Sequence, residues 1–404
     1  MRMSDSLQHL TYCLNVHPGE TWAQCLDNIQ TKTQAVREAV CPTASFGLGL
    51  RLSHQAAQEL AVPKTLAAFK HYLAEQSLYA FTLNGFPYGT FHGSPVKQAV
   101  YKPDWRQPER LAYTTQLADI LAALLPEGIE GSISTVPASY KAWITSDAQR
   151  QAMLDNLTNC AVHLSELEAR TGRVIHLGLE PEPDCYIETT AESIAFLSEL
   201  FQAGALHLAK TRDQALDAAE ALLRRHIGIC FDTCHLALQY EDLAHSLAAL
   251  KAAEIRVSKV QLSAALDTQG TEANRGRLVA FNDPVYLHQV KTQQPDGQIV
   301  AYPDLPEALS SPVIDQDTWR VHCHIPLYYR ERDGIGTTAD LLTPELMSIL
   351  FAASRHFEIE TYTFDVLPAD MRERGVRHSI IEEFKWIQAR ISKQEQIQRK
   401  KEKI

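Results

Sequence analysis

Four short apolar runs of this chain end in carboxylates or imidazoles, and this recurrence constrains the fold more than any other feature. In the clearest run, the strand-like segment 227–231 leads directly into an acid, and an imidazole follows three residues later. The runs lead to Asp232 and His235, to Glu180, to His322 and His324, and to Glu358 and Glu360. Barrel enzymes build their sites from polar ligands that recur at the carboxyl ends of successive strands. The pattern therefore predicts a barrel whose strand ends converge on one site.

Strand-like and helix-like segments alternate along most of the chain. Apolar residues recur at helical spacing over 117–124 and 380–391, between or after the apolar runs. The runs that predict strands lie near residues 11–17, 46–52, 79–84, 131–136, 174–180, 227–232, 255–263 and 357–363. Eight alternating units predict an α/β fold of the closed (β/α)8 type, the TIM barrel. An open doubly wound sheet is disfavoured because neither GxGxxG nor GxxxxGK[ST] occurs in the sequence.

We expect residues 8–392 to form a single barrel, because candidate ligands that lie as far apart as residues 180 and 360 have to meet. Two stretches, 84–108 and 264–318, interrupt the alternation and predict long loop insertions at the C-terminal face. The first is rich in glycine, proline and aromatic residues, and the second is polar. The second insertion is expected to form a lid or rim, with a merely decorative loop as the alternative. Residues 393–404 are expected to be a solvated basic tail.

Composition limits the partners and the compartment. With 404 residues, of which 45% are hydrophobic and 22% charged, the chain resembles an ordinary globular enzyme. The net charge of −11 gives no general attraction to nucleic acid. No apolar run approaches the roughly 20 residues of a transmembrane segment. Eight scattered cysteines without a CxxC pair indicate buried thiols in a reducing compartment, so a cytoplasmic location is expected.

The acids at the strand ends are candidate metal ligands, because hard divalent cations prefer carboxylate oxygens. Asp232 and His235 have the spacing of a site, although an aspartate that caps the next helix is the alternative. Glu180 is preferred over Glu182 because it still lies within its apolar run. Glu360 is preferred over Glu358, which shares its strand face, because it lies nearer the C-terminal end. A buried acid on such a face is costly unless it is paired or bound to a cation.

Two further groups of polar residues are candidates. His322 and His324 share strand parity, and His-x-His is a good ligand pair for zinc or manganese. Two satisfied histidines in a loop are the competing interpretation. Substrate hydrogen bonding or simple helix capping would account for Asn15, His17 and Glu20. A clamp on a polar ligand is one interpretation of Lys97, Lys102, Asp104 and Trp105, but surface positions are favoured for these four.

These residues resemble the xylose-isomerase-like TIM barrels, which include sugar isomerases, epimerases and the endonuclease IV type of AP endonuclease. Segment 229–235 is similar to the endonuclease IV strand motif, and 179–180 and 359–361 look like its flanking metal-binding strands. His322-Cys323-His324 falls where that family has Asp-x-His. A narrower resemblance, carried by segments 15–20, 46–52, 82–89 and 131–135, is to the EboE-type metabolite traffic proteins. It implies a barrel encoded beside a prenyltransferase-like membrane protein, which would be a partner system.

The chain departs from this pattern at three positions. Gln261 stands where relatives commonly carry a metal-binding histidine, and an amide oxygen is a weaker ligand than an imidazole nitrogen. Asn84 and Ser134 stand where endonuclease IV has histidines. The three-zinc nuclease centre therefore looks incomplete. This feature and the acidic net charge both argue against DNA cleavage.

The resemblance implies a metal-dependent sugar or cyclitol isomerase or epimerase that acts on a small polar metabolite. One divalent ion (manganese, zinc or magnesium) would be held by Glu180, Asp232, Gln261 and Glu360, with help from His322 or His324. Glu180 and Glu360 would exchange protons with the substrate, and His235 would hold a substrate oxygen. The alternatives are a metal-dependent hydrolase and a non-catalytic EboE-type protein that binds a metabolite and hands it on.

Overall fold

Eight parallel strands form the centre of the fold in a computed structural model, which describes residues 1–3, 8–93 and 95–401. Their order is β1-β13-β7-β6-β5-β4-β3-β2, and a parallel bridge between Cys13 and Gly49 links the two outer strands. The strands are β1 His9–Tyr12, β2 Phe46–Arg51, β3 Leu78–Asn84, β4 Gly131–Thr135, β5 Ile175–Leu179, β6 Ile227–Asp232, β7 Val257–Leu262 and β13 His356–Ile359. The sheet is nearly closed, so the expected (β/α)8 barrel is confirmed.

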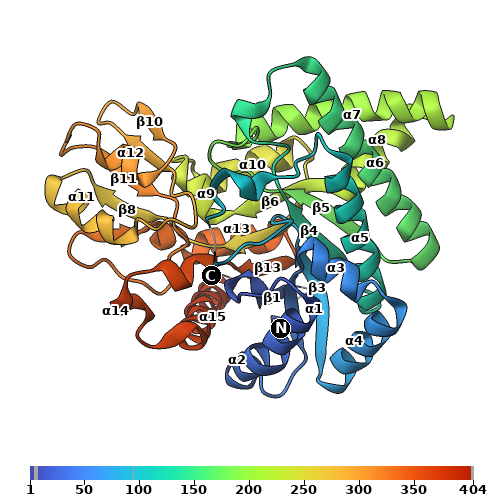
Figure 1. The fold of residues 1–404 in the computed structure, drawn as a ribbon, viewed down its shortest axis with the longest axis horizontal. Coiled ribbons are helices and arrows are strands. Elements are labelled where there is room, and N and C mark those ends of the chain that lie inside the picture. The colour runs from blue at the N-terminus through green and yellow to red at the C-terminus, as the bar shows by residue number, and fades with distance from the viewer. Residues whose placement is uncertain (4–7, 94, 402–404) are drawn as a thin grey trace.

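Helices connect the strands and surround the barrel (Figure 1). Helix α6 shows how sequence sets their ends, because Ser146 caps its first turn together with Gln149 and Gly172 ends it at a φ of 67°. The connecting helices are α1 Trp22–Asn28, α2 Gln34–Val40, α3 His54–Leu60, α4 Pro63–Glu75, α5 Pro108–Leu124, α6 Asp147–Thr171, α7 Thr190–Arg212, α8 Leu216–His226, α9 Thr233–Leu238, α10 Leu243–Ala252 and α13 Pro344–Ala353. A π-helical turn, Ile29–Thr33, joins α1 to α2.

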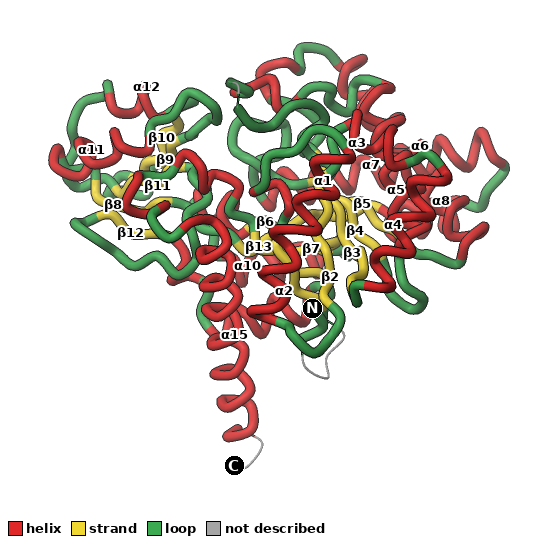
Figure 2. The backbone as a smooth tube through the Cα atoms, turned by 60° about the horizontal axis from the view of Figure 1, so that its bottom comes forward, coloured by secondary structure: helices red, strands yellow, loops and turns green. Residues whose placement is uncertain are grey.

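An antiparallel sheet of five strands is inserted between β7 and α13. Its order is β10-β9-β11-β8-β12, and it forms a lobe beside the barrel (Figures 1 and 2). The elements of the lobe are β8 Leu266–Gln269, α11 Glu272–Leu278, β9 Val290–Gln293, β10 Ile299–Tyr302, α12 Leu305–Leu309, β11 Thr318–Val321 and β12 Ile335–Thr337.

The lobe changes the interpretation of one apolar run. The run that leads to His322 and His324 is β11 of this antiparallel sheet, where it pairs with β8 and β9, and it is not a barrel strand. An apolar run predicts a strand but not its partners, because strand pairing is set by residues that are distant in sequence. The two histidines therefore approach the barrel from the lobe.

The C-terminal helices complete the chain. Helix α14 spans Ala369–Arg372, and α15 spans Gly375–Lys401 and projects away from the body at its end (Figure 2). The backbone of the basic tail from residue 393 continues this helix to Lys401, whereas residues 402–404 lie outside the described residues. Among the described helices, none is long and apolar enough to cross a membrane.

A buried ion pair lies inside the barrel. Lys259 Nζ donates to Glu358 Oε2 at 2.5 Å, and both side chains are fully buried. Gly49 makes room for this acid, because a Cβ at that position would lie only 2.1 Å from Glu358 Oε1. Glu358 is therefore compensated by a lysine and does not reach the strand ends, which leaves Glu360 as the acid of β13 at the C-terminal face.

Candidate metal centre

Three carboxylates from three barrel strands meet at the C-terminal face. Glu180 follows β5, Asp232 ends β6 and Glu360 follows β13, and one oxygen of each lies within 4.8 Å of the others. The outer oxygens Glu180 Oε2, Asp232 Oδ2 and Glu360 Oε2 are buried and have no hydrogen-bond partner among the described residues. Burial and the neighbouring acids hold the pKa values of Glu180 and Glu360 well above their usual range. Such a cluster fits a divalent cation, which would compensate the three charges.

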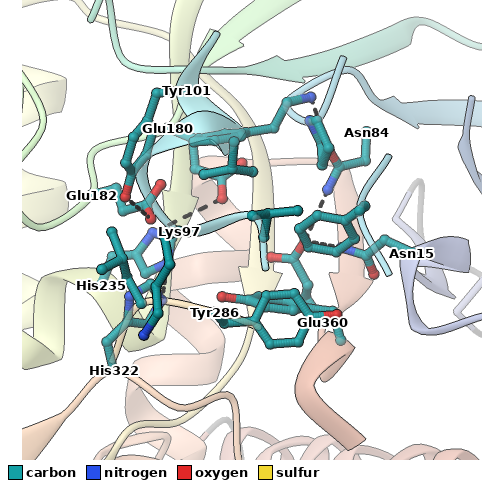
Figure 3. A pocket seen from close by; sticks show the side chains of 17 residues that line it. Asn15, Asn84, Lys97, Tyr101, Glu180, Glu182, His235, Tyr286, His322 and Glu360 are labelled. Atoms are coloured by element: carbon teal, nitrogen blue, oxygen red, sulfur yellow. Dashed lines mark hydrogen bonds and ion pairs between the residues drawn. The ribbon is translucent and has the colours of Figure 1, made fainter. Parts of the chain in front are cut away.

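Two amides fix the orientation of Glu360. Asn15 Nδ2 and Asn84 Nδ2 each donate to Glu360 Oε1 at 2.8 Å (Figure 3). Asn84 also accepts the backbone amide of Phe86 through Oδ1, at 3.0 Å. Because both donors hold the same oxygen, the other oxygen of Glu360 is left free for a ligand.

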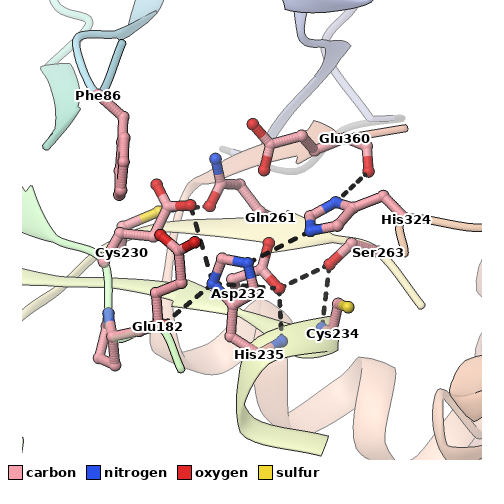
Figure 4. Close-up of polar contacts among 12 residues, drawn as sticks. Phe86, Glu182, Cys230, Asp232, Cys234, His235, Gln261, Ser263, His324 and Glu360 are labelled. Atoms are coloured by element: carbon pink, nitrogen blue, oxygen red, sulfur yellow. Dashed lines mark hydrogen bonds and ion pairs between the residues drawn. The ribbon is translucent and has the colours of Figure 1, made fainter. Parts of the chain in front are cut away.

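Asp232 serves both interpretations of its position. Its Oδ1 caps α9 by accepting the backbone amide of His235 at 2.8 Å, and it also accepts the Ser263 hydroxyl at 2.8 Å (Figure 4). The helix cap and the free Oδ2 occupy different oxygens of one carboxylate. The cap therefore fixes the rotamer and leaves Oδ2 free for a ligand.

Three histidines form a second group beside the carboxylates. The Nε2 atoms of His235, His322 and His324 lie 3.1, 3.2 and 3.2 Å from one another. Each Nδ1 lies 2.7–3.0 Å from an oxygen that can only accept, namely Pro181 O, Gln289 Oε1 and Glu360 O respectively. The hydrogen of each neutral ring is therefore on Nδ1, and three Nε2 lone pairs face one point.

Burial lowers the pKa of all three histidines, which keeps the rings neutral. The pKa of His324 falls to about 4, and that of His322 falls well below the usual value because the two other rings add to the effect of burial. The pKa of His235 is lowered by burial although Asp232 opposes the shift. Three converging neutral imidazoles are a donor set that suits zinc.

The remaining expected ligand, Gln261, lies on β7 beside Asp232. Its Oε1 accepts the Cys230 thiol at 3.0 Å, and its Nε2 is buried without a partner among the residues described. The six expected ligands thus fall into three sets. Glu180, Asp232 and Glu360 form the carboxylate group, His322 and His324 form a group with His235, and Gln261 lies on β7 beside Asp232. The role expected for His235, holding a substrate oxygen, stays a prediction, since the Nε2 lone pair of this ring faces the same point as those of His322 and His324.

Glu182, the second choice on β5, has a different environment. Its Oε1 accepts the Tyr101 hydroxyl at 2.8 Å, and burial raises its pKa to about 8. Gln289, which orients His322, also donates to this tyrosine at 3.2 Å. Neither Tyr101 nor Gln289 was expected from the sequence, because both lie in irregular segments without a motif.

Other polar candidates lie away from the centre. The ring of His17 meets the Tyr12 hydroxyl at 3.1 Å, and Glu20 accepts from Arg51 at 3.0 Å. Lys102 packs over the Trp143 ring, and Asp104 binds Arg106. Asp104 and Trp105 are fully buried, so the surface position expected for these two residues is wrong. Of these candidates, Asn15 and Lys97 line the cavity above the centre, and Lys97 is paired there with Asp304.

A cavity opens above the carboxylates and histidines (Figure 3). Its floor is polar and contains Glu180, Glu182, Glu360, His235 and His322. Its walls come from the 84–108 segment, from the segment before β9 and from Tyr362. A metabolite that entered this cavity would contact the centre.

Comparison with known proteins supports the fold. No protein-family model and no curated protein sequence matches the chain. Among solved structures, the IolI protein with a bound zinc atom is 12% identical, with a TM-score of 0.51 over 95% of this chain and 98% of that one. The probable 3-DHS dehydratase AsbF of Bacillus anthracis, involved in petrobactin synthesis, is 12% identical, with a TM-score of 0.47 over 94% and 98%. The strand order and the similarity to the IolI structure show that the chain has the fold of a (β/α)8 barrel.

Proposed function

We propose that the chain is a metal-dependent enzyme that moves protons between neighbouring carbons of a small hydroxylated metabolite, as sugar and cyclitol isomerases and epimerases do. The observation that carries the proposal is the cluster of Glu180, Asp232 and Glu360, each with a buried, unpartnered oxygen. The zinc atom bound by the structurally similar IolI protein supports a metal in this barrel. When bound, the cation would polarise a substrate carbonyl and its neighbouring hydroxyl.

The residues of the chain divide the work of such a reaction. Asp232 holds one ligand oxygen in place through its cap on α9 and its bond from Ser263. Glu180 and Glu360 lie on separate strands, so their free oxygens can take a proton from one position of the substrate and return it at another. Asn15 and Asn84 keep Glu360 in the rotamer that this transfer requires.

The histidine group supports a second cation position. Tetrahedral zinc with bonds of about 2.0–2.1 Å holds its nitrogen ligands about 3.3 Å apart. The Nε2 atoms here lie 3.1–3.2 Å apart, and each ring is oriented by an acceptor at Nδ1, as metal-bound histidines usually are. We therefore extend the expected single ion to two, one on the carboxylates and one on the histidines.

Elemental analysis tests the two positions. Protein purified without chelator and loaded with zinc or manganese is expected to hold two equivalents. Asp232→Ala and His324→Ala are each expected to lose at least one, with the fold intact by circular dichroism. If Asp232→Ala keeps the full metal content of the wild type, the carboxylate position is wrong.

Proton exchange in deuterated water tests the activity. The metal-loaded protein is offered a panel of sugars, sugar phosphates, cyclitols and amphiphilic α-hydroxyketones, and exchange at a carbon next to a carbonyl is followed by NMR. General acid–base catalysis contributes roughly 10²–10⁴-fold, so Glu360→Gln should lose most of the exchange even where metal remains. Glu199→Gln, a surface carboxylate paired with Arg150, is the matched control and should exchange like wild type. Absence of exchange across the whole panel would contradict the isomerase proposal.

A metal-dependent hydrolase is the second candidate, and the histidine group is the observation that favours it. Three neutral imidazoles around one cation leave a coordination position open, as in zinc hydrolases. Ester and phosphoester cleavage by the same metal-loaded preparation separates this candidate from the isomerase.

The third candidate is non-catalytic carriage of a metabolite, as the EboE-type resemblance implies. The 84–108 segment that carries part of this resemblance also lines the cavity. Tight binding of a panel member without turnover would favour it and would make a prenyltransferase-like membrane partner the next object of study. All eight cysteines are buried free thiols, which supports the cytoplasm as the compartment.

A further inference from the structure

The cavity above the centre has two chemically different halves. The floor carries the carboxylates and histidines, whereas most other residues that line the cavity are aromatic or aliphatic. The apolar half comprises Phe86, Phe91, Val96, Val100, Tyr286 and Leu287. A ligand that filled this space would therefore meet polar groups at one end and apolar surface along the rest of its length.

The aromatic rings of this half pack against one another. The rings of Phe91, Tyr286 and Tyr362 lie with centroids 5.2–5.3 Å apart. Phe91, Val96 and Tyr286 form a small buried cluster of their own, separate from the main core. The wall is thus held in place by packing between two segments that are almost two hundred residues apart.

The cation nearest the wall does not make it polar. Lys97 lines the cavity, but its Nζ donates to Asp304, and the two charges compensate each other. Asp304 is itself fixed, because its Oδ1 accepts the backbone amide of His288 at 2.9 Å. The upper part of the cavity therefore presents no uncompensated charge from this pair to a ligand.

We propose that the substrate is amphiphilic, with a vicinal diol or α-hydroxycarbonyl end that reaches the centre and an apolar, preferably aromatic, body that lies against this wall. The proposal rests on the proposed function, because the polar end is assigned to the metal centre. A fully hydroxylated sugar would leave its hydroxyls at the far end without partners along the aliphatic part of the wall. An apolar body would instead gain by its removal from water.

Two probes that share the same chelating group test the proposal. Hydroxyacetone and 2-hydroxyacetophenone share the α-hydroxyketone and differ by a methyl in place of a phenyl ring. Binding to the metal-loaded full chain is measured by calorimetry. Burying the larger apolar group should make the phenyl probe about 10- to 100-fold tighter. Equal affinities, tighter binding of hydroxyacetone, or no binding of either probe would overturn the proposal.

Two matched variants locate the effect. Leu287→Asp places a carboxylate in the wall and should reduce the phenyl preference at least tenfold while hydroxyacetone binding changes little. Ile314→Asp makes the same kind of change at a position that is 46% exposed on the inserted lobe, and it should retain the preference. A phenyl preference that survives in Leu287→Asp would show that the wall is not responsible. Asp232→Ala separates the contribution of the metal centre from that of the wall. It should weaken the binding of both probes and leave the ratio of their affinities unchanged.

Discussion

Asn15 offers the sharpest test of how the protein orients Glu360, the proposed metal ligand. Its Nδ2 donates to Glu360 Oε1 at 2.8 Å, which is the one hydrogen bond of this side chain among the described residues. A hydrogen bond to a charged group contributes about 1.5–3 kcal/mol, or about 10- to 150-fold in an equilibrium constant. Asn84 holds the same oxygen and remains in Asn15→Ala, so the expected loss of metal affinity is near the lower limit, about tenfold.

Competition with a chromophoric chelator measures the affinity directly. The double variant Asn15→Ala/Asn84→Ala leaves Oε1 with no donor, and its loss should exceed the product of the two single losses. Asn28→Ala is the matched control, because Asn28 is also buried and donates through Nδ2, but to Pro18 O. The reasoning is refuted if Asn15→Ala binds metal within about twofold of the control while its circular dichroism spectrum is unchanged.

Three further predictions concern the stability of the fold and its organisation as a single barrel. Burial raises the pKa of Glu383 to about 7, so the folded state binds the extra proton between about pH 4.5 and 7, and stability falls as the pH rises through this window. Between pH 4.5 and 8, the free energy of unfolding of the wild type should fall by about 3 kcal/mol more than that of Glu383→Gln, as measured by urea titrations at the two pH values. Lys259→Met should cost about 3–5 kcal/mol because it leaves Glu358 buried and unpaired, and adding Glu358→Leu should recover most of that loss in the same assay. Limited proteolysis should nick the chain within 264–318 while the pieces remain associated, and two separately stable halves would contradict a single barrel.

The barrel could be predicted from local patterns. Each of the eight apolar runs overlaps a barrel strand, because a buried parallel strand is apolar on both faces and is bounded by polar residues. The ends of the strands are predicted less accurately than their positions. The first strand ends at Tyr12, since Leu14–Val16 turn into a 3₁₀ helix that carries Asn15 to the site.

The candidate site could be predicted only as far as its strand ends. Glu180, Asp232 and Glu360 follow or end barrel strands, so the parallel sheet itself brings them together. The histidine group depends on the pairing of β11 in the inserted sheet, which no local pattern encodes. The acceptors that orient the rings include the carbonyls of Pro181 and Glu360, and a backbone carbonyl has no signature in a sequence.

The three unpartnered carboxylate oxygens also affect the folding of the metal-free chain. A chain that folds without metal has to bring three acids into one buried space, so it completes its barrel against their mutual repulsion. A cation bound at the proposed centre would offset this repulsion and would shift the equilibrium between folded and unfolded chains toward the folded state. The amount of intact protein in a cell would then follow the supply of the cation, so that metal starvation would act on abundance as well as on activity.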